Sequence, residues 1–115
     1  YDENSVQITG VGCSPGITTG PVRIVTSISE IRSIQKNDIL VTRNTDPAWT
    51  PVFKKLSGLI TETGGILSHG AVVSREYNIP AITAVKQATT LLKNGQQITL
   101  DGNTGVIYTK KQKKE

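Results

Sequence analysis

The sequence of 115 residues is poor in several residue types on which common functional sites depend. It has a single cysteine, Cys13, so neither an internal disulfide nor a CxxC redox pair can form. It has a single histidine, His69, which excludes the HExxH zinc motif, and we expect no metal site in this domain. Methionine is absent, even at position 1, which we interpret as the mark of a piece of a longer chain.

Long apolar runs and aromatic side chains are scarce as well. No apolar run approaches the roughly 20 residues of a membrane span, and the N-terminus lacks a signal-peptide pattern, so we expect a soluble, cytoplasmic domain with no membrane partner. The formal net charge is +4, but the last six residues carry +3 of it, and only 4% of residues are aromatic. A basic chain end is usually solvated and base stacking needs aromatic rings, so we expect no nucleic-acid partner.

The chain is predicted to form one domain at residues 1–109, followed by a basic flexible tail at residues 110–115. No internal repeat or linker divides the domain. Short β-branched runs between glycines and prolines predict seven strands, and Asp101 to Gly105 predicts the turn between the last two. The predicted strands lie at residues 6–9, 21–25, 39–42, 58–61, 81–85, 97–100 and 106–108.

Capping residues and helical spacing predict helices between some of these strands. Asp46-Pro47 and Thr50-Pro51 each place a capping side chain before a proline suited to a first helical turn. The other predicted helices follow Ser27, whose capping box includes Glu30, and cover residues 69–77 and 87–93. Strands mixed with short helices predict an α/β or α+β domain.

The only histidine lies where a glycine pair leads from a strand into a helix. Gly64-Gly65 permits backbone angles that other residues resist, and His69 should begin the helix with Ser68 as N-cap. The free N–H groups and the positive end of the helix dipole favour a phosphate there. The positive end of the helix dipole also disfavours a positively charged imidazolium, so His69 would keep a lone pair and act as a nucleophile. The structural alternative is a histidine that only caps or packs at a turn.

Other catalytic motifs are missing from the sequence. There is no GxxxxGK[ST] phosphate-binding loop, and Ser14 lies in Cys-Ser-Pro-Gly rather than in the GxSxG motif of serine hydrolases. No pair of carboxylates has a recognisable acid/base arrangement. The segment from Gly64-Gly65 to Ser68, which we call the glycine loop, and His69 are therefore the candidate functional site.

Residues 64–81, with the sequence Gly-Gly-Ile-Leu-Ser-His-Gly-Ala-Val-Val-Ser-Arg-Glu-Tyr-Asn-Ile-Pro-Ala, resemble the phosphohistidine "swivelling" domain of the phosphoenolpyruvate-utilising enzymes. That family includes phosphoenolpyruvate synthase, pyruvate phosphate dikinase and rifampin phosphotransferase. Segments at residues 12–16, 20–22, 45–51 and 101–105 are similar to the family too. The resemblance implies an α/β domain with a compact β/β/α fold that swivels between two active sites.

By this resemblance, His69 would accept a phosphoryl group derived from ATP and pass it to an acceptor such as pyruvate or another small molecule. An ATP-grasp domain of the parent chain would bind ATP and Mg²⁺, and a third domain would bind the acceptor, so we expect no cofactor in this domain. The alternative is a non-catalytic anion-binding or docking module with the same fold. The residues expected to support the phosphoryl group are Gly64, Gly65, Ser68, Gly70 and Ala71.

Other residues near the motif are assigned structural roles. Leu67 stands where plant-type dikinases have a regulatory threonine, so no control is expected at this position. Arg75, six residues after His69, is expected at the surface, either solvated or in an ion pair. Cys13 is expected to pack. The segment at residues 46–51 is expected to pack or to contact a partner rather than to take part in the chemistry.

Overall fold

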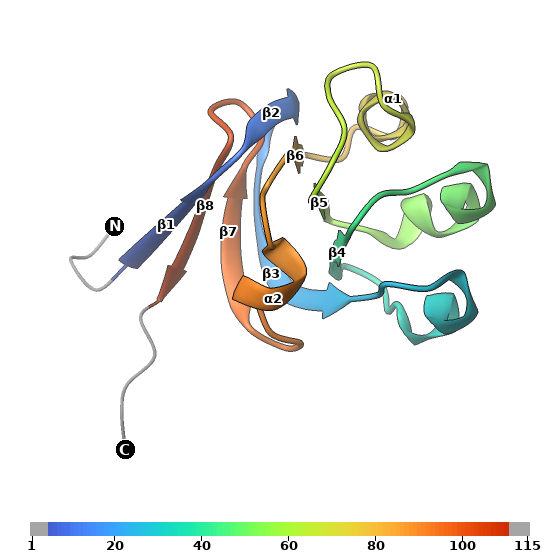
Figure 1. Cartoon of the computed structure of the whole chain (residues 1–115), viewed down its shortest axis with the longest axis horizontal. Coiled ribbons are helices and arrows are strands. Elements are labelled where there is room, and N and C mark those ends of the chain that lie inside the picture. The colour runs from blue at the N-terminus through green and yellow to red at the C-terminus, as the bar shows by residue number, and fades with distance from the viewer. Residues whose placement is uncertain (1–4, 111–115) are drawn as a thin grey trace.

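Eight strands and four short helices build residues 5–110, the part of the chain that this computed structural model describes (Figure 1). The strands are β1 (Ser5–Thr9), β2 (Val11–Ser14), β3 (Ile17–Ile24), β4 (Ile39–Thr42), β5 (Gly58–Thr61), β6 (Ala81–Thr83), β7 (Gln97–Asp101) and β8 (Val106–Lys110). The helices are the 3₁₀ helices η1 (Ile28–Ser33) and η2 (Pro47–Lys55) and the α-helices α1 (His69–Glu76) and α2 (Ala88–Leu91). None of these helices is long and apolar enough to cross a membrane. β8 ends at Lys110, and the rest of the predicted tail lies outside the described residues.

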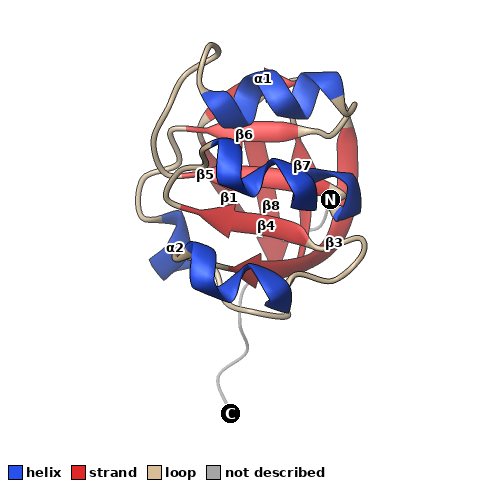
Figure 2. Ribbon diagram, turned by 90° about the vertical axis from the view of Figure 1, so that its right-hand side faces the viewer, coloured by secondary structure: helices blue, strands red, loops and turns tan. Residues whose placement is uncertain are grey.

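The strands pair in the order β1-β8-β7-β3-β4-β5-β6-β2. The neighbours from β3 to β6 are parallel, and the other pairs are antiparallel. β3 joins two halves of the sheet, because its residues 17–21 pair with β7 and its residues 22–24 pair with β4. In Figure 2, strands β4, β5 and β6 run across β7 and β8, so the sheet folds into two layers.

The parallel strands are buried on both faces. On β4, Ile39 and Val41 pack in the core shared with Leu100 of β7, whereas Leu40 packs in a second core with Phe53 of η2. Strands covered on both sides have nearly continuous apolar sequences. The predicted bounds of β4 and β5 agree with the structure for this reason.

A helical layer of α1, η2 and η1 covers the outer face of the parallel strands (Figure 1). The second core lies between this layer and the strands, and Trp49 and Phe53 of η2 are among its buried side chains. The layers therefore follow the order strand, strand, helix, and the predicted β/β/α architecture is confirmed.

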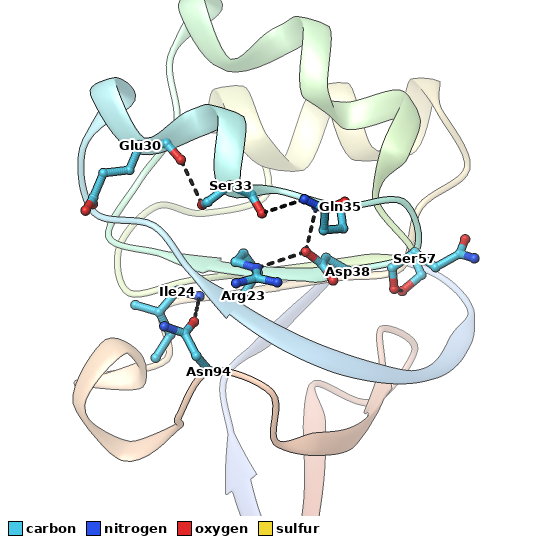
Figure 3. Close-up of polar contacts among 9 residues, drawn as sticks. Arg23, Ile24, Glu30, Ser33, Gln35, Asp38, Ser57 and Asn94 are labelled. Carbon is cyan, nitrogen blue, oxygen red and sulfur yellow. Dashed lines mark hydrogen bonds and ion pairs between the residues drawn. The ribbon is translucent and has the colours of Figure 1, made fainter.

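Polar contacts fix the chain where it enters β4 (Figure 3). Oδ2 of the buried Asp38 accepts hydrogen bonds from Nε of Arg23 at 3.1 Å and from the backbone N–H of Gln35 at 2.8 Å. A buried carboxylate is costly without such donors, so these bonds secure the segment between η1 and β4. Near the end of β3, Oδ1 of Asn94 accepts from the N–H of Ile24 at 2.6 Å.

The sequence prediction missed β2 and the first half of β3. β2 has a glycine at its centre, and glycine gives little strand signal. The strand forms through its antiparallel pairing with β6 at the edge of the sheet. Its position also depends on Gly12, because a Cβ there would overlap the carbonyl oxygen of Gly102 in the turn after β7.

Two helix predictions were wrong in extent. η2 is one 3₁₀ helix that begins at Pro47 and continues through Pro51, so Thr50 lies inside it rather than capping a second helix. Asp46 does cap η2, since its Oδ1 accepts from the N–H of Ala48 at 2.9 Å. α2 has only four residues because Gln87 adopts a left-handed backbone with φ of 60° and Leu92 is extended.

Candidate functional site

The candidate site forms where the loop after β5 enters α1. Gly64 has a φ of +105°, a conformation that favours glycine, and a Cβ there would press on the Ser68 side chain at 3.0 Å. The Ser68 hydroxyl donates to the carbonyl of Gly65 at 2.7 Å and accepts weakly from the N–H of Ala71 at 3.5 Å. Ser68 is thus the N-cap, as predicted, and His69 is the first residue of α1.

A threonine hydroxyl lies beside each nitrogen of the half-buried His69 ring. Oγ1 of Thr45, in the loop after β4, is 2.9 Å from Nδ1. Oγ1 of Thr50, on η2, is 3.2 Å from Nε2. The ring of Phe53 meets the imidazole edge to face, with centroids 6.0 Å apart. The ring orientation is therefore set by η2 and the segment before it.

Gly70 provides space for one of these contacts. A Cβ on residue 70 would lie 3.0 Å from Oγ1 of Thr45 and 3.0 Å from Cδ2 of Leu59. Both distances are tighter than most Cβ contacts, so a side chain here would push against the hydroxyl that holds Nδ1 of His69. Glycine at this position lets Thr45 approach the ring closely.

Arg75 braces the glycine loop from the far end of α1. Its Nη2 donates to the carbonyl of Ile66 at 2.6 Å, and its Nη1 donates to the carbonyl of Cys13 on β2 at 2.8 Å. The side chain is at the surface, as predicted, but its contacts are with two backbone carbonyls rather than with an acidic side chain. It therefore ties the loop before His69 to the sheet edge.

Glu62 anchors the start of the same loop. Its Oε2 accepts from Oγ1 of Thr89 at 2.6 Å and from the Thr89 N–H at 2.8 Å. The bond from the Thr89 hydroxyl, the bond from its N–H and the charge of Arg43 together hold the pKa of Glu62 below its ordinary value, against an opposing effect of burial. The loop is thus fixed at both ends.

The tip of the loop presents apolar side chains to solvent. Leu67 is 84% exposed and Ile66 is 57% exposed, directly before Ser68 and His69. Figure 1 shows this loop arching beside α1 at the edge of the molecule. We call Ile66 and Leu67 the loop tip. Within residues 5–110 no group of three His, Cys, Asp or Glu side chains could hold a metal ion.

The sequence of this region matches a described family. Residues 34–105 match the family "PEP-utilising enzyme, mobile domain", and this stretch includes η2, the glycine loop and α1. The chain belongs to the PEP-utilising enzyme mobile domains. The resemblance seen in the sequence is confirmed.

Relatives of this mobile domain are much longer proteins. A probable phosphoenolpyruvate synthase of Archaeoglobus fulgidus is 41% identical over 106 residues, which are 92% of this chain and 14% of the relative. A rifampicin phosphotransferase of Bacillus cereus is 44% identical over 100 residues, which are 87% of this chain and 11% of the relative. The mobile domain thus corresponds to a small part of each of these multidomain relatives.

Solved structures share the fold of the mobile domain. The solution structure of Enzyme I (nEIt) matches with a TM-score of 0.58 and 25% identity, over 67% of this chain and 32% of that one. The aconitase X structure of Thermococcus kodakaraensis matches with a TM-score of 0.68 and 14% identity, over 90% of this chain and 98% of that one. The second likeness concerns the fold alone.

Sequence reasoning missed Thr45 and Thr50, because Thr50 was interpreted as a capping residue before Pro51 and Thr45 was given no role of its own. A usable signal was present, since the predicted strands at 39–42 and 58–61 precede the two segments that meet at His69. If these strands are parallel neighbours, their carboxyl ends lie at one edge of the sheet. The polar residues after each strand would then be expected side by side.

Proposed function

We propose that the mobile domain carries a phosphoryl group on His69 within a multidomain, ATP-dependent phosphotransferase. The observation that carries this proposal is the His69 ring, held at its Nδ1 by Thr45 and placed as the first residue of α1. Nδ1 has the shorter contact, at 2.9 Å, so we assign Nε2, 3.2 Å from the Thr50 hydroxyl, as the nitrogen that attacks phosphorus. The first N–H groups of a helix have no partner within the helix and favour an anion.

The transfer step is an in-line displacement at phosphorus. The lone pair of Nε2 forms the N–P bond, while the bond between phosphorus and the donor oxygen breaks and its electron pair leaves with that oxygen. Such a step depends on positioning and on neutralising charge. The positive end of α1 supports the incoming charge, and Gly64, Gly65, Ser68, Gly70 and Ala71 shape the loop and the first turn around it.

In this proposal, the sites that bind ATP, Mg²⁺ and the acceptor belong to other domains. An ATP-grasp domain supplies ATP and Mg²⁺, and an acceptor domain binds pyruvate or another small molecule. The loop tip supports such docking, because Leu67 and Ile66 are exposed apolar side chains beside the reacting ring. A partner surface that covers them would exclude water from His69 during transfer.

The test uses the phosphotransferase that contains this domain and ATP labelled at the β-phosphate. The proposal expects acid-labile, base-stable label in the wild type and none in His69→Ala. Label that survives this substitution contradicts the proposal. Phosphate-dependent NMR shifts at residues 65–71 without covalent label would instead favour a non-catalytic anion-binding module.

A further inference from the structure

Thr50 occupies the nitrogen that the proposed function requires to be free. Its Oγ1 lies 3.2 Å from Nε2 of His69, within hydrogen-bonding distance. A neutral imidazole has one N–H and one lone pair. If the lone pair is on Nε2, the N–H is on Nδ1 and donates to Thr45, and the Thr50 hydroxyl must donate to Nε2.

The two threonines contact different nitrogens of the ring. Oγ1 of Thr45 lies against Gly70, 3.0 Å from the place that a Cβ there would take, and it contacts the nitrogen that does not react. Thr50 is half-buried on η2, and its hydroxyl contacts His69 from the other side of the ring. Rotation about its Cα–Cβ bond would move this hydroxyl without moving the helix.

We propose that Thr50 controls the reacting nitrogen of His69 and exchanges its hydrogen-bond acceptor once transfer has occurred. This inference rests on the proposed function. In the resting state its hydroxyl donates to the Nε2 lone pair and withholds it from reaction. After the N–P bond has formed, the hydroxyl turns to donate to a phosphoryl oxygen. Thr50 loses no proton, since only the acceptor of its hydrogen bond changes.

The resting contact is tested on the unphosphorylated chain with ¹⁵N-labelled histidine. In Thr50→Val the Nε2 resonance should move toward that of a nitrogen without a donor, while Nδ1 stays unchanged. Thr50→Ser, which retains the hydroxyl, should restore the wild-type resonance. An unchanged Nε2 resonance in Thr50→Val overturns the proposal. Amide spectra of both variants are compared with that of the wild type. They show whether Thr50→Val has lost its fold, independently of the change at Nε2.

The exchange of acceptors is tested by chemical phosphorylation of the same chain with phosphoramidate, which requires no partner domain. Thr50→Val should react about fivefold faster, because it has no hydrogen bond to the Nε2 lone pair that must break before the N–P bond forms. Its phosphohistidine should also show a shifted ³¹P resonance, which Thr50→Ser returns to the wild-type position. An equal or slower rate, or identical ³¹P resonances, overturns the proposal.

These results separate the two proposals. Failure of the parent enzyme to label His69 would contradict the proposed function and leave the chemical rates unaffected. Normal enzymatic labelling with equal chemical rates in wild type and Thr50→Val would contradict the role of Thr50 alone.

Discussion

Oγ1 of Thr45 lies 2.9 Å from Nδ1 of His69, although 24 residues separate them in the sequence. The contact fixes the ring from the side opposite to Thr50, and in the tautomer with its proton on Nδ1 the Thr45 hydroxyl accepts the hydrogen bond from this N–H. Thr45→Val keeps the shape of the side chain and removes the hydroxyl. We expect the rate of phosphohistidine formation in the parent enzyme to fall about tenfold, because the ring loses its orientation.

The matched control for this prediction is Thr45→Ser, which keeps the hydroxyl and should retain most of the rate. Thermal unfolding of both variants shows whether the loss comes from the fold. A Thr45→Val enzyme that labels His69 at the wild-type rate would contradict the positioning role of Thr45.

The fold was largely predictable because its local sequence patterns, such as apolar runs and capping residues, match the burial and the contacts of the same residues in the structure. Ile39, Leu40 and Val41 form a continuous apolar run, and β4 is covered on both faces. Ser68 precedes the apolar positions of α1 and caps this helix. At these places the sequence pattern and the tertiary contacts require the same structure.

The missed parts depend on contacts between distant segments. β2 has little strand signal of its own and forms by pairing with β6. The Thr50 hydroxyl was assigned to local capping and Thr45 was given no role of its own, whereas both hydroxyls contact His69 on α1, 19 and 24 residues away. A hydroxyl has several possible partners, and only the packing of η2 against α1 selects His69.

The loop tip offers a test of domain docking. Leu67→Ser changes a side chain that is 84% exposed, so the free energy of unfolding should change by less than about 0.5 kcal/mol. If a partner domain covers this residue during transfer, labelling of His69 by ATP in the parent enzyme should fall about tenfold. Rates of labelling and urea unfolding measure the two quantities.

Ile28 provides the matched control, because it is 44% exposed on η1, away from α1 at the other end of the helical layer (Figure 1). Ile28→Ser should leave labelling unchanged. Equal labelling rates in Leu67→Ser and Ile28→Ser would show that the loop tip is not part of the docking surface.

Glu62 makes the stability of the loop depend on pH. Its pKa in the folded chain is below its ordinary value of 4.5, chiefly because the Thr89 hydroxyl donates to the carboxylate. The unfolded state therefore binds this proton more readily, and the stabilisation is present above that ordinary value and is lost as the pH falls through the lower folded pKa. Glu62→Gln should be less stable than wild type near neutral pH, and the difference should shrink in acid.

Urea unfolding from about pH 7 to about pH 3 measures this difference. Thr89→Val is the matching variant, because it removes the hydroxyl donor while keeping the carboxylate and the Thr89 backbone N–H contact. It should reduce the pH dependence in the same direction. A constant difference between wild type and Glu62→Gln over the whole range would contradict the assignment.

Gly102 holds the turn after β7 against β2, and among the glycines of the described residues it is the one where an added Cβ would come closest to another atom. A Cβ on residue 102 would overlap the carbonyl oxygen of Ser14, and the Gly102 N–H donates to the carbonyl of Gly16 at 2.8 Å. Backbone cannot yield as a flexible side chain can. Gly102→Ala should therefore cost about 3 kcal/mol of unfolding free energy.

Gly65→Ala is the control for this substitution, because a Cβ on residue 65 would meet nothing within 4 Å. Alanine there also lowers the conformational entropy of the unfolded chain, so its stability should equal or slightly exceed that of the wild type. Urea unfolding midpoints compare the two variants directly. A Gly102→Ala chain as stable as Gly65→Ala would contradict this prediction. It would mean that β2 can move away from the turn far enough to make room for a Cβ beside Ser14.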